Sequence, residues 1–478
     1  MSSRGVNSNP ILRRVARRFG WGLADQAMSS MSNAAVSFYV ARELGAADFG
    51  AFSLAYVTYS FALNASRGLA TDPLVVRYST ADKDRWRAAI AQSSGTALMV
   101  GLATGACCLV AAIALSGTTR LAFLALGLTL PGLLLQDSWR YAFFTAGRGG
   151  QAFLNDTVWT LSLLPALAIL RISHHDTVLW FVLAWGAAAA VAACVGPLQA
   201  RTLPRVTKAW TWVSDTRDLG PRYLAENTSN SGAGQLRSYG VGFLSGLAVV
   251  GYIQAGLLLM GPFMVVFMGI SLVTVPEAVR VLRRSPQYLG LYCLVVGGGL
   301  AVMAVAWGTG LLIALPHGLG HLLLGALWKP ADSLVIPLTI SVMGACFQQG
   351  ATAGLHALGA AQRSLRAMFI ASLIYLTLGL IGAYFDGAVG ACRGAAVATW
   401  IGAFLWWRQL RVGIRESDQL PDGVGLLPAH LSGRLHALLR LRNPVSSPPP
   451  DASAAPPGPM THSHSPRTAV TGDLRRRQ

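Results

Sequence analysis

Charged side chains are scarce in this sequence, and acidic ones are the scarcest. Only 12% of the 478 residues are Asp, Glu, Lys or Arg, about half the share of a typical soluble domain. With 53% hydrophobic residues and a mean hydropathy of +0.48, this shortage excludes an ordinary soluble globular protein. The formal net charge of +18 is better explained by the cytoplasmic loops of a membrane protein, which collect Lys and Arg, than by nucleic-acid binding.

The signatures of catalysis are also missing. The sequence contains no P-loop, no nucleophile elbow and no dinucleotide-binding fingerprint. Its six cysteines lie in or beside apolar segments and lack the spacing of a metal site. His317 and His321 are four residues apart, but two glycines separate them and no acid accompanies them. We therefore predict no enzymatic activity, no catalytic residues, no metal site and no bound cofactor.

Long apolar runs are what the sequence has in abundance. Two examples, at 97–115 and 291–315, reach the roughly 20 residues that cross a bilayer. The apolar pattern predicts an all-α polytopic membrane protein with about twelve transmembrane helices. They are expected at 19–41, 49–70, 92–116, 119–146, 152–171 and 177–199, and then at 221–245, 248–275, 289–315, 334–358, 367–385 and 388–408.

The basic residues give this layout an orientation. Most Lys and Arg of the loops fall on the side of the N-terminus, and an even number of spans returns the chain to that side. We therefore expect a multi-pass protein of a bacterial cytoplasmic membrane with both termini in the cytoplasm. The segment at 11–23 lacks the apolar core and cleavage site of a signal peptide, so the first helix is expected to direct insertion.

Composition also divides the chain into segments. A basic cytoplasmic N-terminus (1–18) precedes a six-helix lobe (19–199), a cytoplasmic connector (200–220) and a second six-helix lobe (221–410). Residues 411–442 form a cytoplasmic linker, of which 424–442 is either an amphipathic helix on the inner leaflet or an undistinguished linker. The Pro- and Ser-rich stretch 443–478 has the composition of a disordered tail.

An internal repeat relates the two lobes. "LADQ" (23–26) matches "LAEN" (224–227), and the same offset matches Gly50 with Gly251. "ATDPLVVR" (70–77) matches "VTVPEAVR" (273–280), while Gln136 and Gly147 match Gln348 and Gly359. Because each lobe has an even number of helices, the lobes are expected to run the same way and to be related by a pseudo-twofold axis along the membrane normal.

Two stretches carry a family resemblance. Residues 21–56 have a polar first helix followed by the turn "ARELGAADFGAFSLA", and 133–159 read "LLLQDSWRYAFFTAGRGGQAFLNDTVW". Both resemble polysaccharide flippases for O-antigen or exopolysaccharide in the multidrug/oligosaccharidyl-lipid/polysaccharide exporter superfamily, over about residues 15–410. The resemblance implies two six-helix lobes around a polar cleft. It also implies transfer of an undecaprenyl-pyrophosphate-linked oligosaccharide from the inner to the outer leaflet, for polysaccharide biosynthesis, by alternating access.

Polar side chains inside the predicted helices are the candidate site, because such residues are costly in hydrocarbon and usually functional. Arginine suits bidentate contacts with phosphate, so the candidates for the pyrophosphate and sugar are Arg140, Arg237, Arg67, Asn33 and Gln136. The candidates for coupling to a proton or sodium gradient are Asp25, Glu226, Asp137 and Asp156.

Simpler roles are open for several of these residues. Arg140 could pair locally with Asp137, Arg67 could extend to the membrane surface, and Arg237 could pair with another helix. Asp25 and Glu226 could serve helix contacts through Gln26 and Asn227, or interact with helix dipoles.

Other functions compete with flipping. One is a cation-coupled antiporter of drugs or other small molecules with the same fold, and another is a membrane polysaccharide polymerase or ligase. The expected partners of the flippase are the lipid-linked oligosaccharide, membrane lipids, and glycosyltransferases or a polymerase of the same pathway, without nucleic acid.

Overall fold

The computed structural model describes residues 10–418. The chain divides into two compact units, Met1–Val424 and Gly425–Gln478, and every described residue belongs to the first. The predicted tail (443–478) and most of the predicted linker (411–442), including the segment 424–442, lie outside the described residues.

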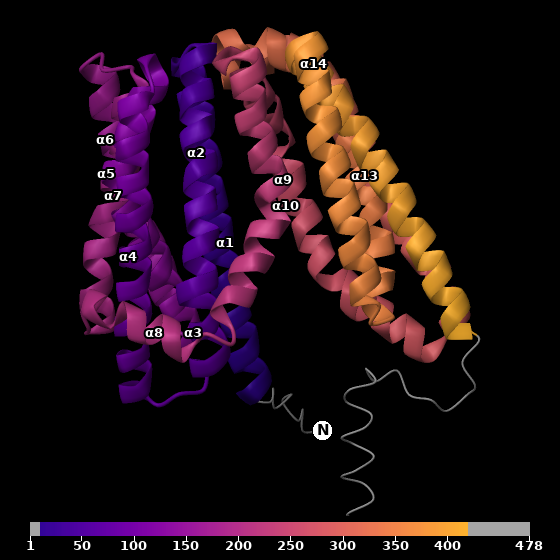
Figure 1. The fold of residues 1–478 in the computed structure, drawn as a ribbon, viewed down its shortest axis with the longest axis horizontal. Helices are drawn as coiled ribbons and strands as arrows, with labels where there is room; N and C mark the ends of the chain where they lie inside the picture. Colours follow the sequence, from indigo (N-terminus) through magenta and orange to yellow (C-terminus); the bar gives the residue numbers. More distant parts are fainter. Residues whose placement is uncertain (1–9, 419–478) are drawn as a thin grey trace, which may run out of the picture. The chain divides into compact units, whose positions relative to one another are not determined.

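The first half of the described chain consists of six long helical segments and a connector (Figure 1). They are α1 (Pro10–Glu43), a continuous stretch of α2 (Ala46–Ser66), the π-helix η1 (Arg67–Thr71) and α3 (Asp72–Tyr78), and then α4 (Lys83–Ala114), α5 (Gly117–Thr145), α6 (Gly149–Ile172) and α7 (Val178–Ala200). The connector contains the short helices η2 (Val206–Lys208) and α8 (Ala209–Asp215), which pack on α4.

The second half repeats this order. It contains α9 (Gly220–Ser245), α10 (Leu247–Arg284), η3 (Pro286–Tyr288), α11 (Leu289–Ala314), the short η4 (Leu315–Leu319), α12 (Gly320–Leu324) and η5 (Gly325–Leu327), then α13 (Trp328–Ala357) and α14 (Ala361–Asp418). Asp386 and Gly387 have non-helical backbone angles and divide α14 into two limbs. Counting these limbs separately, the described chain has six long segments in each half, twelve in all.

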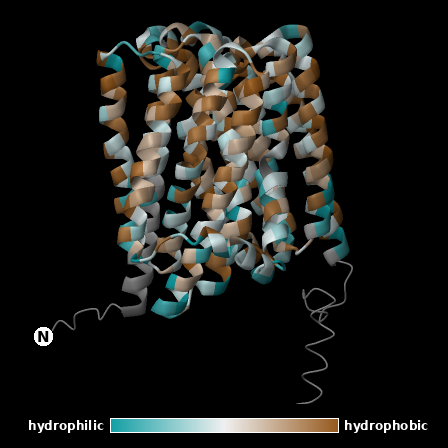
Figure 2. Ribbon diagram, turned by 60° about the vertical axis from the view of Figure 1, so that its left-hand side comes forward, coloured by the Kyte–Doolittle hydropathy of each residue, from teal (hydrophilic) through white to brown (hydrophobic). Residues whose placement is uncertain are grey.

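Seven stretches of the described chain are long and apolar enough to cross a membrane, and two of them, 286–357 and 362–416, each contain two long helices. The long helices outside these stretches are α1, α2 and α9. Figure 2 shows hydrophobic residues along much of the helices and hydrophilic residues gathered near the end from which the N-terminus emerges. Four of the nine candidate residues lie on two of these more polar helices, Asp25 and Asn33 on α1 and Glu226 and Arg237 on α9.

Several helices extend beyond their predicted bounds. α1 begins at Pro10 rather than at 19, α4 begins at Lys83 rather than at 92, and α10 ends at Arg284 rather than at 275. Hydropathy identifies only the part of a helix that suits hydrocarbon, whereas its ends are set by local signals. Proline is favoured at the first helical position, as at Pro10, and the Asp82 side chain caps α4 by accepting the Arg85 N–H at 2.9 Å.

The internal repeat is visible in the helix ends. Gly147 follows α5 and Gly359 follows α13, both in the left-handed region, with φ of +67° and +68°. The hydrogen bonds are the same: Arg148 N–H donates to Phe143 O at 2.8 Å, and Ala360 N–H to Leu355 O at 3.0 Å. Both helices therefore end in the same glycine-dependent motif.

The repeat is also visible where the halves meet. A Cβ on Gly50 of α2 would overlap the carbonyl of Leu247, and a Cβ on Gly251 of α10 would overlap the carbonyl of Ala46. Since 46 and 247 differ by the same 201 residues as 50 and 251, the contact is reciprocal. The predicted architecture is confirmed: two six-helix halves run in the same direction and are related by a pseudo-twofold axis, which passes close to this crossing.

Candidate functional site

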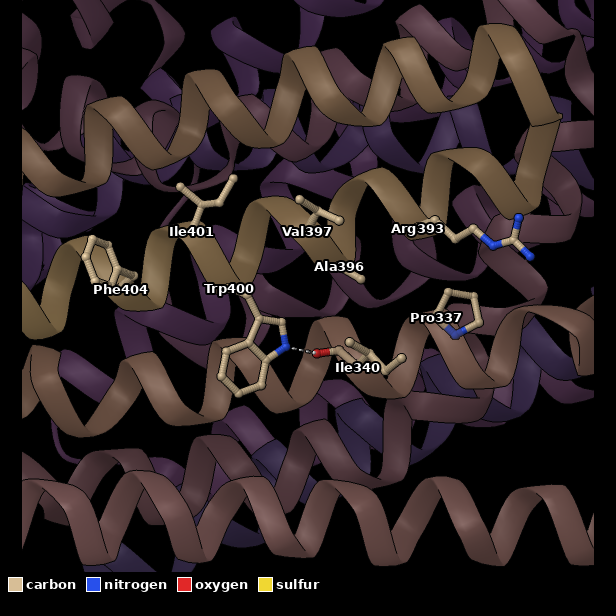
Figure 3. A pocket seen from close by; sticks show the side chains of 8 residues that line it. All are labelled: Pro337, Ile340, Arg393, Ala396, Val397, Trp400, Ile401 and Phe404. Atoms are coloured by element: carbon tan, nitrogen blue, oxygen red, sulfur yellow. Dashed lines mark hydrogen bonds between the residues drawn. The ribbon is translucent and has the colours of Figure 1, made fainter.

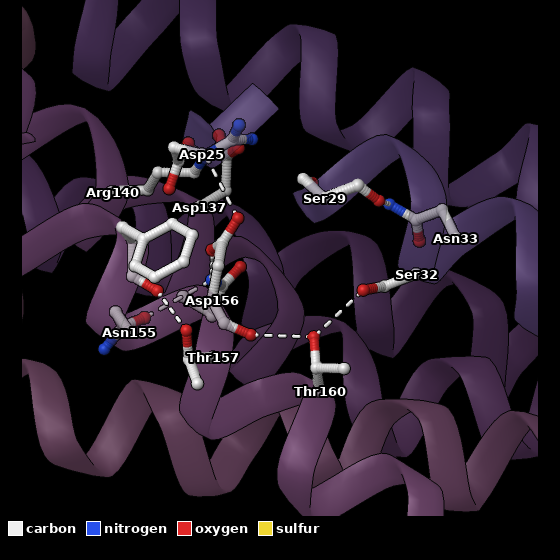
Figure 4. A network of polar contacts seen from close by, with 12 residues as sticks. Asp25, Ser29, Ser32, Asn33, Asp137, Arg140, Asn155, Asp156, Thr157 and Thr160 are labelled. Carbon is white, nitrogen blue, oxygen red and sulfur yellow. Dashed lines mark hydrogen bonds and ion pairs between the residues drawn. The ribbon is translucent and has the colours of Figure 1, made fainter. Parts of the chain in front are cut away.

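A buried ion-pair cluster joins α1, α5 and α6 in the first half (Figure 4). Arg140 Nε donates to Asp25 Oδ2 at 2.6 Å and lies 3.4 Å from Asp156 Oδ2. Asp25 is 0% exposed. The predicted polar layer in this half therefore brings together residues that are 115 positions apart in the chain.

Amide side chains extend the cluster toward α7. Gln136 Nε2 donates to Asp156 Oδ1 at 2.8 Å and contacts Asn155 Oδ1 at 3.3 Å. Asn155 Nδ2 in turn donates to the Ala192 carbonyl at 2.9 Å and to Gln199 Oε1 at 3.0 Å. These bonds fix the orientation of the Asp156 carboxylate.

A second ion pair lies beside the first cluster. Arg67 donates to both carboxylate oxygens of Asp137, from Nε to Oδ2 at 3.0 Å and from Nη2 to Oδ1 at 2.6 Å. The guanidinium also lies over the Tyr141 ring, 5.0 Å from its centroid. Arg67 starts the π-helix η1, and such segments are frequent at functional sites.

The pairing differs from the local alternatives that the sequence suggested. Asp137 pairs with Arg67 rather than with Arg140, and Arg67 turns inward to Asp137 rather than to the membrane surface. Sequence spacing favours partners on one helix, whereas the packing of α1, α2, α5 and α6 supplies partners from other helices.

Among the described residues, the charges of these two clusters do not balance. Three aspartates, Asp25, Asp137 and Asp156, face two arginines, which leaves one formal negative charge when all are ionised. In addition, Asp25 Oδ1 and Asp156 Oδ2 are buried and accept no hydrogen bond from the described residues. Buried carboxylate oxygens of this kind can hold a proton or a small cation.

Arg237 of α9 has a different environment in the second half. It is 5% exposed, and its Nε and Nη1 donate no hydrogen bond within the described part of the chain. Its guanidinium lies 4.7 Å from the centroid of the Tyr375 ring on α14. The neighbouring Gln235 Oε1 is likewise buried and accepts no hydrogen bond there. The structure thus contains a buried cation whose polar contacts are not completed by residues 10–418.

The repeat-related acids occupy unlike positions. Glu226 is exposed near the start of α9, whereas Asp25 is buried. The next residue, Asn227, donates to Asp72 Oδ2 at 2.8 Å. Asn33 donates to the Ser29 carbonyl one turn earlier, at 2.9 Å. The structure therefore gathers Asp25, Gln136, Arg140 and Asp156, and leaves Glu226, Asn33 and Arg237 outside that cluster.

Sequence reasoning missed several members of these networks. Asn155 lies next to Asp156 in an otherwise apolar helix, and this adjacency was a usable signal. Ser32 and Thr160, whose hydroxyls lie 3.0 Å apart, gave no such signal, because Ser and Thr are ordinary in membrane helices. Tyr375 was invisible because its role depends on α9 and α14 lying together.

Comparison with solved structures identifies the fold. An inward-facing multidrug resistance MATE family transporter of the MOP superfamily has a TM-score of 0.62 at 15% identity, over 84% of this chain and 99% of that one. The lipid II flippase MurJ in an inward closed conformation gives 0.61 at 11% identity, over 88% and 97%. An outward-facing MATE family transporter gives 0.51 at 13% identity, over 85% and 96%.

Sequence comparison adds nothing to this similarity. No family model matches the chain, and no curated protein matches it. At identities of 11–15% the similarity concerns the arrangement of helices and not the chemistry of the site. The chain therefore has the twelve-helix, two-lobed fold seen in transporters of the MOP superfamily.

Proposed function

We propose that the protein is a flippase that moves an undecaprenyl-pyrophosphate-linked oligosaccharide from the inner to the outer leaflet of a bacterial cytoplasmic membrane, for polysaccharide biosynthesis. The two halves would alternate access to a polar passage between them. The sugar and pyrophosphate would cross in this passage while the polyprenyl chain stays in lipid. No bond is made or broken, so the protein would not be an enzyme.

The observation that carries this proposal is Arg237. An uncompensated buried charge costs several kcal/mol, on the order of the penalty for breaking a buried ion pair. A protein tolerates this cost where a ligand of opposite charge completes the site. A pyrophosphate supplies oxygen acceptors for both Nε and Nη1, and guanidinium binds such groups in a bidentate manner. Arg140 and Arg67 are already paired with aspartates, so they would contact the cargo only after rearrangement.

The unbalanced aspartates suggest how transport is driven. With one formal negative charge in excess in the first half, a proton or a sodium ion would neutralise the cluster around Asp25 and Asp156. Binding and release on opposite sides of the membrane would then couple the gradient to the change of conformation. Glu226 is exposed and would contribute less to this coupling.

A drug or cation antiporter is the second candidate. The excess of aspartates over arginines in the buried clusters of the first half favours it, because a cationic substrate could replace the proton at Asp25 and Asp156. The two candidates differ at Arg237, which attracts an anionic cargo and repels a cationic one.

Substitution of Arg237 in a strain that depends on this transporter separates the candidates. We expect Arg237→Gln to abolish surface polysaccharide and Arg237→Lys to restore part of it, since Lys keeps the charge but not the bidentate geometry. Arg120→Gln, an exposed arginine at the start of α5, is the matched control. Full export by a well-inserted Arg237→Gln variant would reject the anion-binding role, and a gain in drug resistance would support the antiporter.

Contacts with glycosyltransferases or a polymerase are a further expectation.

A further inference from the structure

An apolar groove runs along the surface between α13 and the second limb of α14 (Figure 3). Its volume is about 670 Å³. Pro337 and Ile340 of α13 form one wall, and the indole of Trp400 is held in place by donation to the Ile340 carbonyl at 3.1 Å. This groove is far in sequence from every candidate residue discussed above, and the proposed transport does not use it.

The α14 side of the groove is a single helix face. Its lining residues follow the i, i+3, i+4, i+7 spacing of such a face, from Arg393 through Ala396, Val397, Trp400 and Ile401 to Phe404. The eleven residue-to-residue steps from Arg393 to Phe404 span about 16 Å at 1.5 Å per residue. This length matches one leaflet, which is about half of the roughly 30 Å hydrocarbon thickness. Val397 and Phe404 are more than half exposed, as expected of side chains in contact with lipid.

The groove has a cation at one end only. Arg393 follows the kink of α14 at Asp386 and Gly387 by about two turns, and its side chain is 69% exposed. This kink lies at the end of the helices opposite the start of α1 (Figure 1). Its Nη1 donates to Asp386 Oδ2 at 3.0 Å. Figure 3 shows this guanidinium at one end of the groove, beside Pro337, and a long basic side chain at the end of an apolar helix face can reach lipid headgroups.

We propose that this groove binds one acyl chain of an anionic phospholipid of the leaflet remote from the N-terminus, with the phosphate at Arg393. The apolar face from Ala396 to Phe404 accepts the chain, and the guanidinium selects the negatively charged headgroup. Asp386 competes with the phosphate for Arg393 and sets the affinity. The one-leaflet length favours a phospholipid over a polyprenyl chain, which is much longer than the groove.

Native mass spectrometry of the full-length protein, stripped of lipid and titrated with dioleoyl phosphatidylglycerol or dioleoyl phosphatidylethanolamine, tests this proposal. We expect phosphatidylglycerol to bind about tenfold more tightly, as one charge-assisted hydrogen bond would give. Arg393→Gln should remove this preference, and Asp386→Asn should increase it several-fold. Val397→Trp should fill the groove and weaken both lipids. Arg120→Gln, an exposed arginine away from the groove, should change neither.

The test is decisive because Arg393→Gln and Asp386→Asn are expected to change the preference for phosphatidylglycerol in opposite directions. If Arg393 and Asp386 served only to hold the kink of α14, both substitutions would shift lipid binding in the same direction, and the proposal would be wrong. An unchanged lipid preference in Arg393→Gln would also overturn it. The proposal would also be overturned if undecaprenyl phosphate displaced phosphatidylglycerol when present at the lower concentration of the two, because the groove would then hold the polyprenyl chain.

Discussion

Gly50 and Gly251 lie against each other across the pseudo-twofold axis, and each is within reach of the other's backbone. A Cβ on Gly50 would lie 3.2 Å from Gly251 N, and a Cβ on Gly251 would lie 3.2 Å from Gly50 N. The two residues come from the second helix of each half, near the end where α1 passes into α2. Any side chain at either position must separate the halves at this end.

Alanine at either glycine is therefore expected to open this end of the molecule, by the same amount for Gly50→Ala and Gly251→Ala. Ser53 is 5% exposed and lies one turn further along α2, so Ser53→Cys is a nearly isosteric reporter. In a background with Cys107 and Cys194 replaced, we expect labelling by an impermeant maleimide to rise severalfold in both alanine variants. Equal labelling with and without the alanine would show that the glycine contact does not hold the halves together.

Removal of the charge at Arg237 should stabilise the protein while it destroys transport. Arg237→Met keeps the length of the side chain and removes an uncompensated buried cation, which we expect to raise the free energy of unfolding by about 1–3 kcal/mol. A functional site commonly carries such a cost. Thermal unfolding in detergent measures the effect, with Arg366→Met, outside the Arg237–Tyr375 contact, as a control. A lower midpoint for Arg237→Met would mean that the guanidinium has partners beyond residues 10–418.

The aspartate excess predicts opposite results at Asp25 and Arg140. Arg140→Met leaves Asp25 and Asp156 buried without their cation and should destabilise the protein by about 3–5 kcal/mol. Asp25→Asn instead leaves two aspartates with two arginines, so it should fold well yet lose the dependence of transport on a proton or sodium gradient. The double variant should recover part of the lost stability. Gradient-dependent transport by Asp25→Asn would exclude this cluster from coupling.

The connector offers a pH-dependent contact outside the membrane. Arg77 of α3 donates to the Asp215 carbonyl at 2.6 Å and to Asp218 Oδ1 at 2.5 Å. Desolvation raises the pKa of Asp218, but the hydrogen bonds from Arg77 and from its own backbone, together with the charges of Arg77 and Arg222, outweigh this, and the pKa lies below its ordinary value. A lowered carboxyl pKa stabilises the folded state above the unfolded value of about 4, and this contribution is lost as the pH falls through the folded value.

Hydrogen exchange in residues 209–219 should therefore be slow at pH 7 and faster, after correction for intrinsic rates, below about pH 4. Asp218→Asn should show the faster exchange already at pH 7 and no step below it. The effect is expected to be small because the pair is exposed. If the Asp218→Asn variant showed an increase in exchange of the same size below about pH 4, the increase would have to come from another titrating group.

The fold could be predicted from the sequence because its main determinants are local. Apolar runs define most spans, and short matches such as Gly147 with Gly359 revealed the repeat because a left-handed helix end requires glycine. Helix ends such as Pro10 and Lys83 were less accessible, since these turns lie beyond the apolar stretches.

The candidate site was predictable only in part. The scarcity of charge made Asp25, Arg140 and Arg237 conspicuous, so the residue types and positions were found. Their partners were not, because the contacts of Arg140 with Asp25 and of Arg67 with Asp137 depend on how four helices pack. The same limit explains why the matching positions of Asp25 and Glu226 did not predict their unlike burial.

The most direct test of the central claim is a flipping assay in proteoliposomes. A polyprenyl-pyrophosphate-linked sugar carrying a fluorophore on the sugar would be placed in both leaflets, and its accessibility to an impermeant quencher would be followed. We predict that the wild-type protein brings inner-leaflet fluorophore to the quencher within minutes, and that Arg237→Gln leaves it protected as in protein-free vesicles. Equal quenching with Arg237→Gln and the wild-type protein would contradict the account.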